Sequence, residues 1–173
     1  MKLKNNSITM KSEIIKQYTH YNLWANELLL KLIGDKISDE KINQTIVSSF
    51  PSLLKTIYHI WDAETIWLMR FKGEPVTSWP SKTFTGNYSE AAERMHTIDG
   101  AIVTFCESID DNKLEKSFTY KNIEGKLFDN ILWEAILHCM NHSTYHRGQI
   151  VTMLRQLGID EIPSTDFIAF CRI

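Results

Sequence analysis

Cysteine is scarce in this sequence, and a long hydrophobic run is missing. The three cysteines, Cys106, Cys139 and Cys171, show no Cys-x-x-Cys spacing, which argues against a disulfide framework and favours reduced thiols in the cytoplasm. No run of roughly 18 apolar residues occurs, so no transmembrane helix is expected. The segment Met1–Lys16 contains lysines but no apolar stretch before a small-residue cleavage site, so no export signal is expected. We therefore predict a soluble, cytoplasmic protein.

A large net charge is also missing. The 19 basic and 21 acidic residues leave a formal charge of −2, so no strong field attracts nucleic acid phosphates or anionic lipids. We predict neither a nucleic-acid partner nor a membrane partner. A chain of 173 residues matches one domain, 1–173, which is large enough to bury a core without a structural metal. Any bound metal is then expected to serve function rather than folding.

Four segments carry apolar residues at the three- and four-residue spacing of amphipathic helices. The predicted helices run over Lys11–Ile33, Ser49 to about Phe71, Ser89–Ser108, and Asp129 or Asn130 to Leu157. Gly34 and Gly158 are expected to end the first and the last helix. Ser49 is the expected cap of the second helix, followed by the early proline Pro51.

The segments between and after these helices lack a sustained period. We predict a polar connector over 35–49, a long loop over 72–88 and an irregular tail beyond Pro163. Two short strands, Ser117–Tyr120 and Lys126–Phe128, flank Asn122–Gly125 and predict a small hairpin whose glycine supplies the turn. The predicted fold class is therefore all-α: an antiparallel four-helix bundle with a small hairpin before the last long helix.

The last predicted helix carries histidines on its buried stripe. At about 100° per residue, His142 and His146 share one side of the helix with Ile150 and Met153. Two histidines spaced i, i+4 on one face can present their imidazole nitrogens to a single metal ion. His138 lies one turn earlier and forms a second candidate pair with His142, and spacing alone does not choose between the pairs. Each histidine is alternatively a core residue bonded to a hydroxyl or carbonyl group.

A third metal ligand must come from another helix. His59, in the second predicted helix, lies at the edge of a wide apolar arc, a position that suits a cavity near a helix seam. His20 and His96 compete with it. Glu64 falls in the middle of the same arc, where an unpaired carboxylate would be costly. We interpret it either as a buried partner for an arginine, tyrosine or backbone donor, or as an acceptor that orients a ligand histidine.

Further side chains lie near the predicted histidine site. Gln149 and Tyr145 lie about 20° and 60° from His142, and Gln149 could bond a metal-bound water or bond across the bundle. Arg147 points about 140° away, which suits a structural ion pair or the end of the last helix better than a catalytic role. Cys139 lies about 60° away, and we interpret it as a small buried side chain rather than a ligand. Three tryptophans either line an apolar pocket or belong to the core: Trp61, Trp67 and Trp79.

The segment His138–Gln149 resembles the signature H-x-x-N-H-x-x-Y-H-R-G-Q in the last helix of the DinB superfamily. That superfamily of four-helix bundles includes YfiT-like metal-dependent hydrolases and the bacillithiol and mycothiol transferases. Further similar segments extend the likeness over nearly the whole chain: Tyr21–Asn26, His59 with Ala63–Glu64 and Trp67–Leu68, Leu154–Gly158 and Thr165–Phe167.

The resemblance implies one divalent metal ion held by His59, His142 and His146, with His138 near the ion but not bound to it. We expect Glu64, Gln149 and Tyr145 to lie around the metal site without binding the ion. The family suggests zinc or nickel, with iron or manganese as alternatives, and a homodimer as the assembly. Members are named for induction after DNA damage, but the charge balance gives this chain no excess of positive charge with which to bind DNA.

Three neutral imidazoles leave a divalent ion with open positions for water or substrate. Such an ion either lowers the pKa of a bound water, which leads to hydrolysis, or binds a thiol as thiolate, which leads to thiol transfer. We predict the second, with a small-molecule thiol and a small electrophile as partners, and a metal-dependent hydrolase as the alternative. A non-catalytic, stress-related metal-binding bundle would instead show a fourth protein ligand: His138, Glu64 or Cys139.

Overall fold

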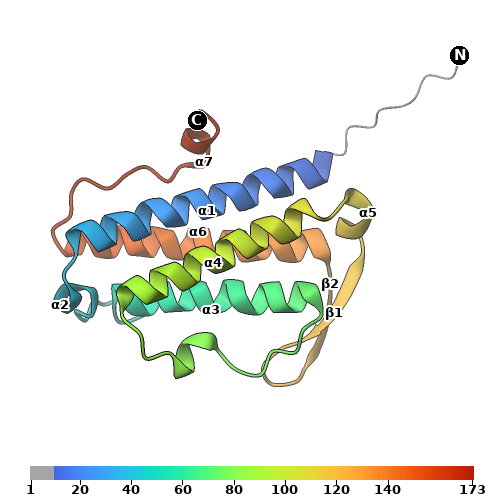
Figure 1. The fold of residues 1–173 in the computed structure, drawn as a ribbon, viewed down its shortest axis with the longest axis horizontal. Helices are drawn as coiled ribbons and strands as arrows, with labels where there is room; N and C mark the ends of the chain where they lie inside the picture. The colour runs from blue at the N-terminus through green and yellow to red at the C-terminus, as the bar shows by residue number, and fades with distance from the viewer. Residues whose placement is uncertain (1–9) are drawn as a thin grey trace, which may run out of the picture.

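A computed structural model describes residues 10–173 of the chain. The prediction about an export signal in the N-terminal segment falls largely outside these residues. Four long helices dominate the described part and lie side by side (Figure 1): α1 (Met10–Lys36), α3 (Leu53–Lys72), α4 (Tyr88–Glu107) and α6 (Leu132–Gln156). None of the helices in residues 10–173 is long and apolar enough to cross a membrane.

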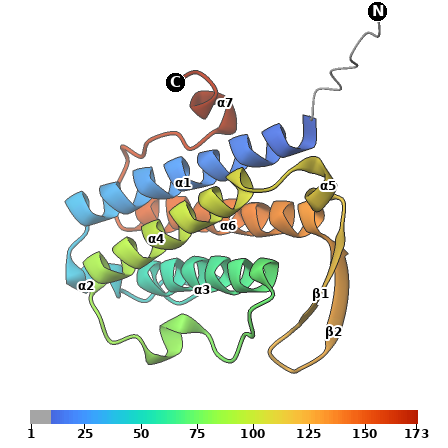
Figure 2. The same cartoon turned by 45° about the vertical axis from the view of Figure 1, so that its right-hand side comes forward.

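The four long helices form a ring in which α1 and α3 each pack against both α4 and α6. The pairs α1/α4 and α3/α6 run antiparallel (Figures 1 and 2). The long connection over residues 73–87 runs back along the bundle, so that α4 starts at the same end as α3 and runs in the same direction. The predicted four-helix bundle with a hairpin before the last long helix is confirmed. The antiparallel α3/α6 contact places side chains of two distant chain segments on a common seam.

The segments predicted to be irregular contain short helices. These are α2 (Asp39–Ile42), the 3₁₀ helix η1 (Pro80–Thr83) and α7 (Phe167–Phe170), and a fourth short helix, α5 (Asp111–Leu114), precedes the hairpin. Tertiary contacts explain two of these helices, α2 and α7. Ile42 of α2 is buried in the core, and Phe170 of α7 packs against Tyr21 and Trp24 of α1. Helices this short depend on such packing rather than on their own periodicity.

Helix α3 begins later than predicted. Ser52 rather than Ser49 is its N-cap, and the Ser52 hydroxyl accepts a hydrogen bond from the backbone N–H of Lys55. Residues 47–52, including Pro51, form bends before the helix. Helix α4 begins with a reciprocal capping box, in which Asn87 and Glu90 bond each other's backbone N–H groups.

Two further boundaries also correct the prediction. Helix α1 continues through Gly34 to Lys36, because the packing of the fully buried Ile33 outweighs the low helix propensity of glycine. Asp129 and Asn130 do not cap α6, since both lie in a strand of the hairpin. At the other end, Gly158 adopts a φ of 87° directly after α6, as expected for a glycine that ends a helix.

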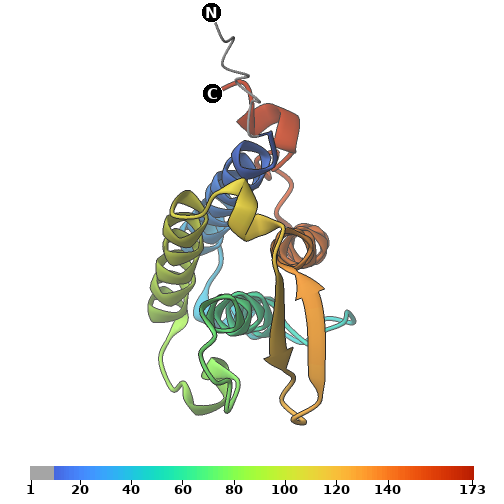
Figure 3. The ribbon, with the colours of Figure 1, turned by 90° about the vertical axis from the view of Figure 1, so that its right-hand side faces the viewer.

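The predicted hairpin is present as strands β1 (Ser117–Lys121) and β2 (Leu127–Ile131), which pair antiparallel. Gly125 supplies the turn with a φ of 82°. The hairpin extends along one end of α3 and α6 (Figure 3). Tyr120 of β1 packs edge-on against Trp67 of α3, with ring centroids 5.2 Å apart. The hairpin therefore covers that end of the bundle and does not form the core of a sheet.

A layer of buried polar side chains divides the core into two apolar clusters. One cluster lies at the α2 end and includes Leu29, Ile57 and Met153, and the other lies at the hairpin end and includes Phe71, Ile102 and Met140. Along every long helix, the polar residues occupy positions between the two clusters. The polar layer consists of Asn22, Asn26, Glu64, Asp99, Ser143 and Arg147.

Candidate metal centre

Three histidines from two helices converge on the α3/α6 seam. His59 comes from α3, and His142 and His146 come from successive turns of α6. One ring nitrogen of each lies within 4.8 Å of the other two, and the Nε2 atoms of His59 and His142 are 2.9 Å apart. Within residues 10–173, this is the group of histidine, cysteine and acidic side chains with the geometry to hold a metal ion.

Burial keeps these imidazoles neutral. Burial and the neighbouring His146 lower the pKa of His59 to about 4. Burial together with the other histidines lowers the pKa of His142 to about 3, and burial also lowers the pKa of His146. A neutral imidazole has one nitrogen lone pair free for a metal, whereas an imidazolium has none. The site therefore presents three competent ligands near neutral pH.

Gln149 determines which nitrogen of His146 is free. Its Oε1 lies 2.9 Å from His146 Nδ1, and its Nε2 donates to the hydroxyl of Ser49 at 2.8 Å. Because an amide oxygen only accepts hydrogen bonds, Nδ1 carries the proton and Nε2 keeps its lone pair. The sequence placed Gln149 near the site, but its bond to a ligand histidine comes from the structure.

Phe50 forms a wall of the site that sequence reasoning missed. Its ring stacks on His59 with centroids 4.2 Å apart and an angle of 27° between the planes, and it lies edge-on to His146 at 5.6 Å. Sequence reasoning assigned Phe50 to the first turn of a helix. It lies instead in the bends before α3, and no signal in the sequence marks it as a site residue.

The other predicted neighbours lie at the rim of the site. His138 is exposed, and its ring centroid is 6.4 Å from that of His142 and 5.2 Å from that of Trp67. It is outside the convergent group. Tyr145 is 64% exposed, with its ring 5.0 Å from that of His146. His138 instead lines a separate cavity together with Trp67.

The competing histidines on the other helices lie elsewhere. His20 Nε2 is 3.1 Å from a carboxylate oxygen of Glu107, and His96 Nδ1 is 3.0 Å from one of Glu27. Both are contacts between the exposed sides of α1 and α4. His20 and His96 therefore do not complete the site.

Glu64 belongs to the buried polar layer and not to the histidine site. Its Oε1 accepts from Ser143 Oγ at 2.6 Å and from Asn22 Nδ2 at 2.8 Å. No histidine among the described residues bonds it, so the interpretation as an acceptor for a ligand histidine is wrong. Its buried partners are amides and a hydroxyl, in place of the arginine, tyrosine or backbone donor that we expected.

Arg147 and Cys139 are both buried away from the site. The Arg147 guanidinium donates to the side-chain oxygens of Asn22 and Asn26, so it forms amide contacts rather than the predicted ion pair. It faces α1, the other long helix that packs against α6. Cys139 is buried, and burial raises the pKa of its thiol well above the ordinary value, in keeping with the predicted small core residue.

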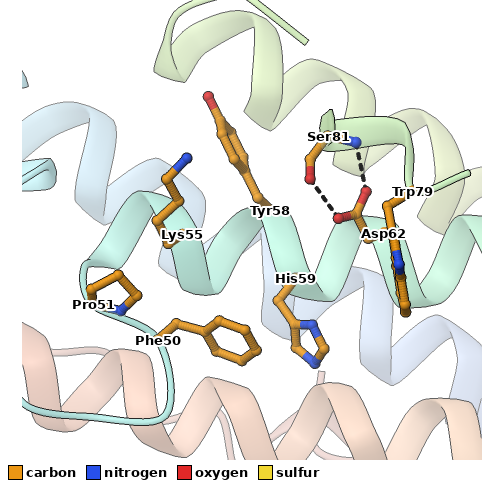
Figure 4. Close-up of a pocket in the computed structure, with 8 residues that line it drawn as sticks. All are labelled: Phe50, Pro51, Lys55, Tyr58, His59, Asp62, Trp79 and Ser81. Carbon is orange, nitrogen blue, oxygen red and sulfur yellow. Dashed lines mark hydrogen bonds between the residues drawn. The ribbon is translucent and has the colours of Figure 1, made fainter. Parts of the chain in front are cut away.

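A cavity of about 420 Å³ opens beside His59 (Figure 4). Asp62 is held at its edge by the backbone N–H and the hydroxyl of Ser81, at 2.7 and 2.5 Å. Trp79 lines this cavity, whereas Trp61 and Trp67 line two others. The residues around it are Phe50, Pro51, Lys55, Tyr58, His59, Asp62, Trp79 and Ser81. Its walls are mainly apolar, as in pockets for small organic molecules.

The fold and the site together define a class: four-helix bundles with a histidine cluster on facing helices, next to an open cavity. The chain belongs to the DinB family, whose sequence pattern matches residues 1–172. It is 26% identical over 154 residues to Protein DinB of Bacillus subtilis (strain 168), a match that covers 85% of this chain and 87% of that protein.

Two solved structures are similar to the bundle. A DinB-like protein from Bacillus cereus ATCC 10987 matches with a TM-score of 0.61 at 20% identity, over 82% of this chain and 90% of that one. A DinB-like protein from Bacillus subtilis matches with a TM-score of 0.63 at 17% identity, over 87% of this chain and 98% of that one. At these identities the similarity supports the fold alone.

Proposed function

We propose that this protein is a divalent-metal-dependent enzyme that transfers a small-molecule thiol to a small electrophile. The observation that carries the proposal is the convergence of three neutral imidazoles on the α3/α6 seam, one of which, His59, also lines an apolar cavity. A structural zinc site normally has four protein ligands, whereas a catalytic site has three and an open position. Within the described residues, no fourth histidine, cysteine or carboxylate joins the group.

His59, His142 and His146 would hold the ion in this proposal. A divalent cation bound there would lower the pKa of a coordinated thiol and so favour the nucleophilic thiolate. Gln149 keeps the proton of His146 on Nδ1, and Phe50 restrains the ring of His59 by stacking. The cavity would receive the electrophile, and the indole of Trp79 would contact its apolar part.

We propose zinc or nickel as the ion, because imidazole suits both, with iron or manganese as alternatives. We also propose a homodimer, which rests on the resemblance to the DinB superfamily. The mass of the native protein, measured by light scattering during size-exclusion chromatography, tests this assembly: a monomer mass would contradict it.

The second candidate function is a metal-dependent hydrolase. The same three-histidine arrangement supports it, since a water molecule in the open position would have its pKa lowered in the same way. A thiol requirement separates the two, because only the transferase consumes a thiol in proportion to product. A non-catalytic metal-binding bundle would bind metal without turning over either class of substrate.

Elemental analysis by mass spectrometry tests the metal site first. The untagged protein, purified without chelator, is compared with the His142→Ala variant, and both are then assayed with a panel of small thiols and electrophiles. We expect near-stoichiometric zinc, nickel, iron or manganese in the parent protein, loss of that metal in the variant, and thiol consumption by the parent alone. If both proteins remain metal-free after incubation with these ions, the proposal is wrong.

A further inference from the structure

A second cavity lies at the hairpin end of the bundle, away from the histidine site. It has a volume of about 270 Å³ and lies between the end of α3, the residues after it and the hairpin. Its lining consists of Arg70, Gly73–Val76, Thr119–Lys121 and Leu127. Arg70 is three turns along α3 from His59, a rise of about 16 Å. The proposed function makes no use of this cavity.

The guanidinium of Arg70 packs against two aromatic rings. Its Cζ lies 4.7 Å from the ring centroid of Trp67 and 4.8 Å from that of Tyr120. The two ring centroids are themselves only 5.2 Å apart, with an angle of 66° between the planes. Both rings therefore contact the guanidinium, and Arg70 also lines the cavity. Such contacts fix a cation in place without neutralising it.

Arg70 lacks an anionic partner within the described part of the chain. None of the ion pairs or side-chain hydrogen bonds among residues 10–173 involves its guanidinium. Its Nε is buried and unpartnered, while the two Nη groups are not among the buried unpartnered atoms. The Nη groups therefore remain accessible. Burial lowers the pKa of Arg70, which shows that its surroundings disfavour the bare cation.

The charges around the cavity favour an anion. Lys121 of β1 adds a second cation to its lining, and Glu74 contributes the one carboxylate there. A guanidinium with open Nη donors matches the paired oxygens of a carboxylate or phosphate group in a two-pronged contact. A bound anion would accept hydrogen bonds from the guanidinium, which has no acceptor for them among the described residues.

Arg94 provides an internal comparison. Its guanidinium also packs against two rings, with Cζ 5.2 Å from the ring centroid of Phe84 and 6.0 Å from that of Trp61. The cavity that it lines, however, also contains the carboxylates of Glu90 and Glu93. Stacking on aromatic rings is thus common to both arginines, whereas a cavity with an excess of positive charge occurs at Arg70.

We propose that the cavity at Arg70 binds the carboxylate or phosphate group of a small molecule. Arg70 provides the two-pronged contact, and Lys121 adds a second positive charge. The site is independent of the histidine cluster and does not rest on the proposed function. Because carboxylates and phosphates share the recognised chemistry, the two classes of ligand are distinguished by experiment.

Isothermal titration calorimetry of the full-length protein with inorganic phosphate, and separately with succinate, tests the site at constant ionic strength. We expect saturable binding of at least one probe, and the stronger of the two identifies the ligand class. Arg70→Gln should weaken binding about tenfold or more, because hydrogen bonds between charged groups are lost. Arg94→Gln, the matched control, should bind like the parent protein.

Three further variants refine the test. Glu74→Gln should strengthen binding, since it removes the carboxylate from the lining. His142→Ala should bind the probes unchanged, which separates this site from an anion held by a metal at the histidines. Arg70→Lys keeps the charge but loses the planar fork, so it should bind more weakly than the parent protein.

The proposal fails if the parent protein binds neither probe. It also fails if Arg70→Gln, shown by circular dichroism to be folded, binds as tightly as the parent. Should Arg70→Gln not fold, Arg70→Lys decides the matter: affinity equal to that of the parent would overturn the two-pronged contact.

Discussion

The carboxylates of Glu64 and Asp99 accept hydrogen bonds from the same amide group, Nδ2 of Asn22, at 2.8 and 3.0 Å. Glu64 comes from α3, Asp99 from α4 and Asn22 from α1, so one amide connects three helices at the middle of the bundle. Arg147 of α6 is the cation of this polar layer. Burial and the nearby Glu64 raise the pKa of Asp99 well above its ordinary value.

The raised pKa of Asp99 predicts that folding stability falls as pH increases. Above the ordinary aspartate pKa of about 3.9, the unfolded chain has released this proton while the folded chain still holds it. The resulting contribution to stability is complete below that pH and is lost as pH rises through the folded-state pKa. Asp99→Asn cannot ionise and should show a flatter pH dependence. Urea unfolding at a series of pH values measures both proteins, and parallel curves would contradict the prediction.

Gln149 should control metal affinity through His146. Gln149→Leu removes the acceptor for the Nδ1 proton, so we expect a loss of about 10- to 100-fold in affinity for zinc or nickel, as is usual for groups that orient a ligand histidine. Gln149→Glu retains an acceptor and should restore most of the affinity. Competition with a chromogenic chelator gives both values. Equal weakening in the two variants would mean that the amide serves only its bond to Ser49.

Trp79→Ala should raise the KM for an apolar electrophile and leave kcat nearly unchanged. The indole lines the cavity beside His59 but is not part of the histidine cluster, so its loss removes binding common to ground and transition states. Trp24→Ala, which alters a half-buried tryptophan in contact with α7, is the control. Steady-state kinetics decide the matter, and unchanged kinetics in Trp79→Ala would remove this residue from the pocket.

Ser52→Ala should destabilise the protein by about 1 kcal/mol, because it removes the N-cap of α3. Ser49→Ala changes an exposed serine outside the helix and removes only its surface hydrogen bond from Gln149, so it should stay within about 0.5 kcal/mol of the parent protein. Chemical denaturation of the two single variants compares the two candidate caps directly. No loss of stability in Ser52→Ala would contradict the assignment of Ser52 as the N-cap.

Periodicity predicted the four long helices because each buries a stripe of mainly apolar residues at helical spacing, which a sequence displays directly. It did not locate Ser52, since Ser49 and Ser52 are both acceptable caps and packing decides between them. It also predicted an ion pair for Arg147, which bonds two asparagines of α1 instead. In a ring of four helices, α6 contacts both α1 and α3, so a side chain far from the histidines on a helical wheel can still be buried.

The sequence by itself determined the class of fold and two of the three histidines of the candidate site, and the family resemblance in it named His59 as the third. The i, i+4 spacing of His142 and His146 places both on one face of a helix, whatever that helix packs against. Only the tertiary structure brought His59 to them, stacked Phe50 on it and joined Glu64 to Asp99. These relationships connect residues far apart in the chain, and they depend on which helices become neighbours. Local periodicity carries no information on that choice.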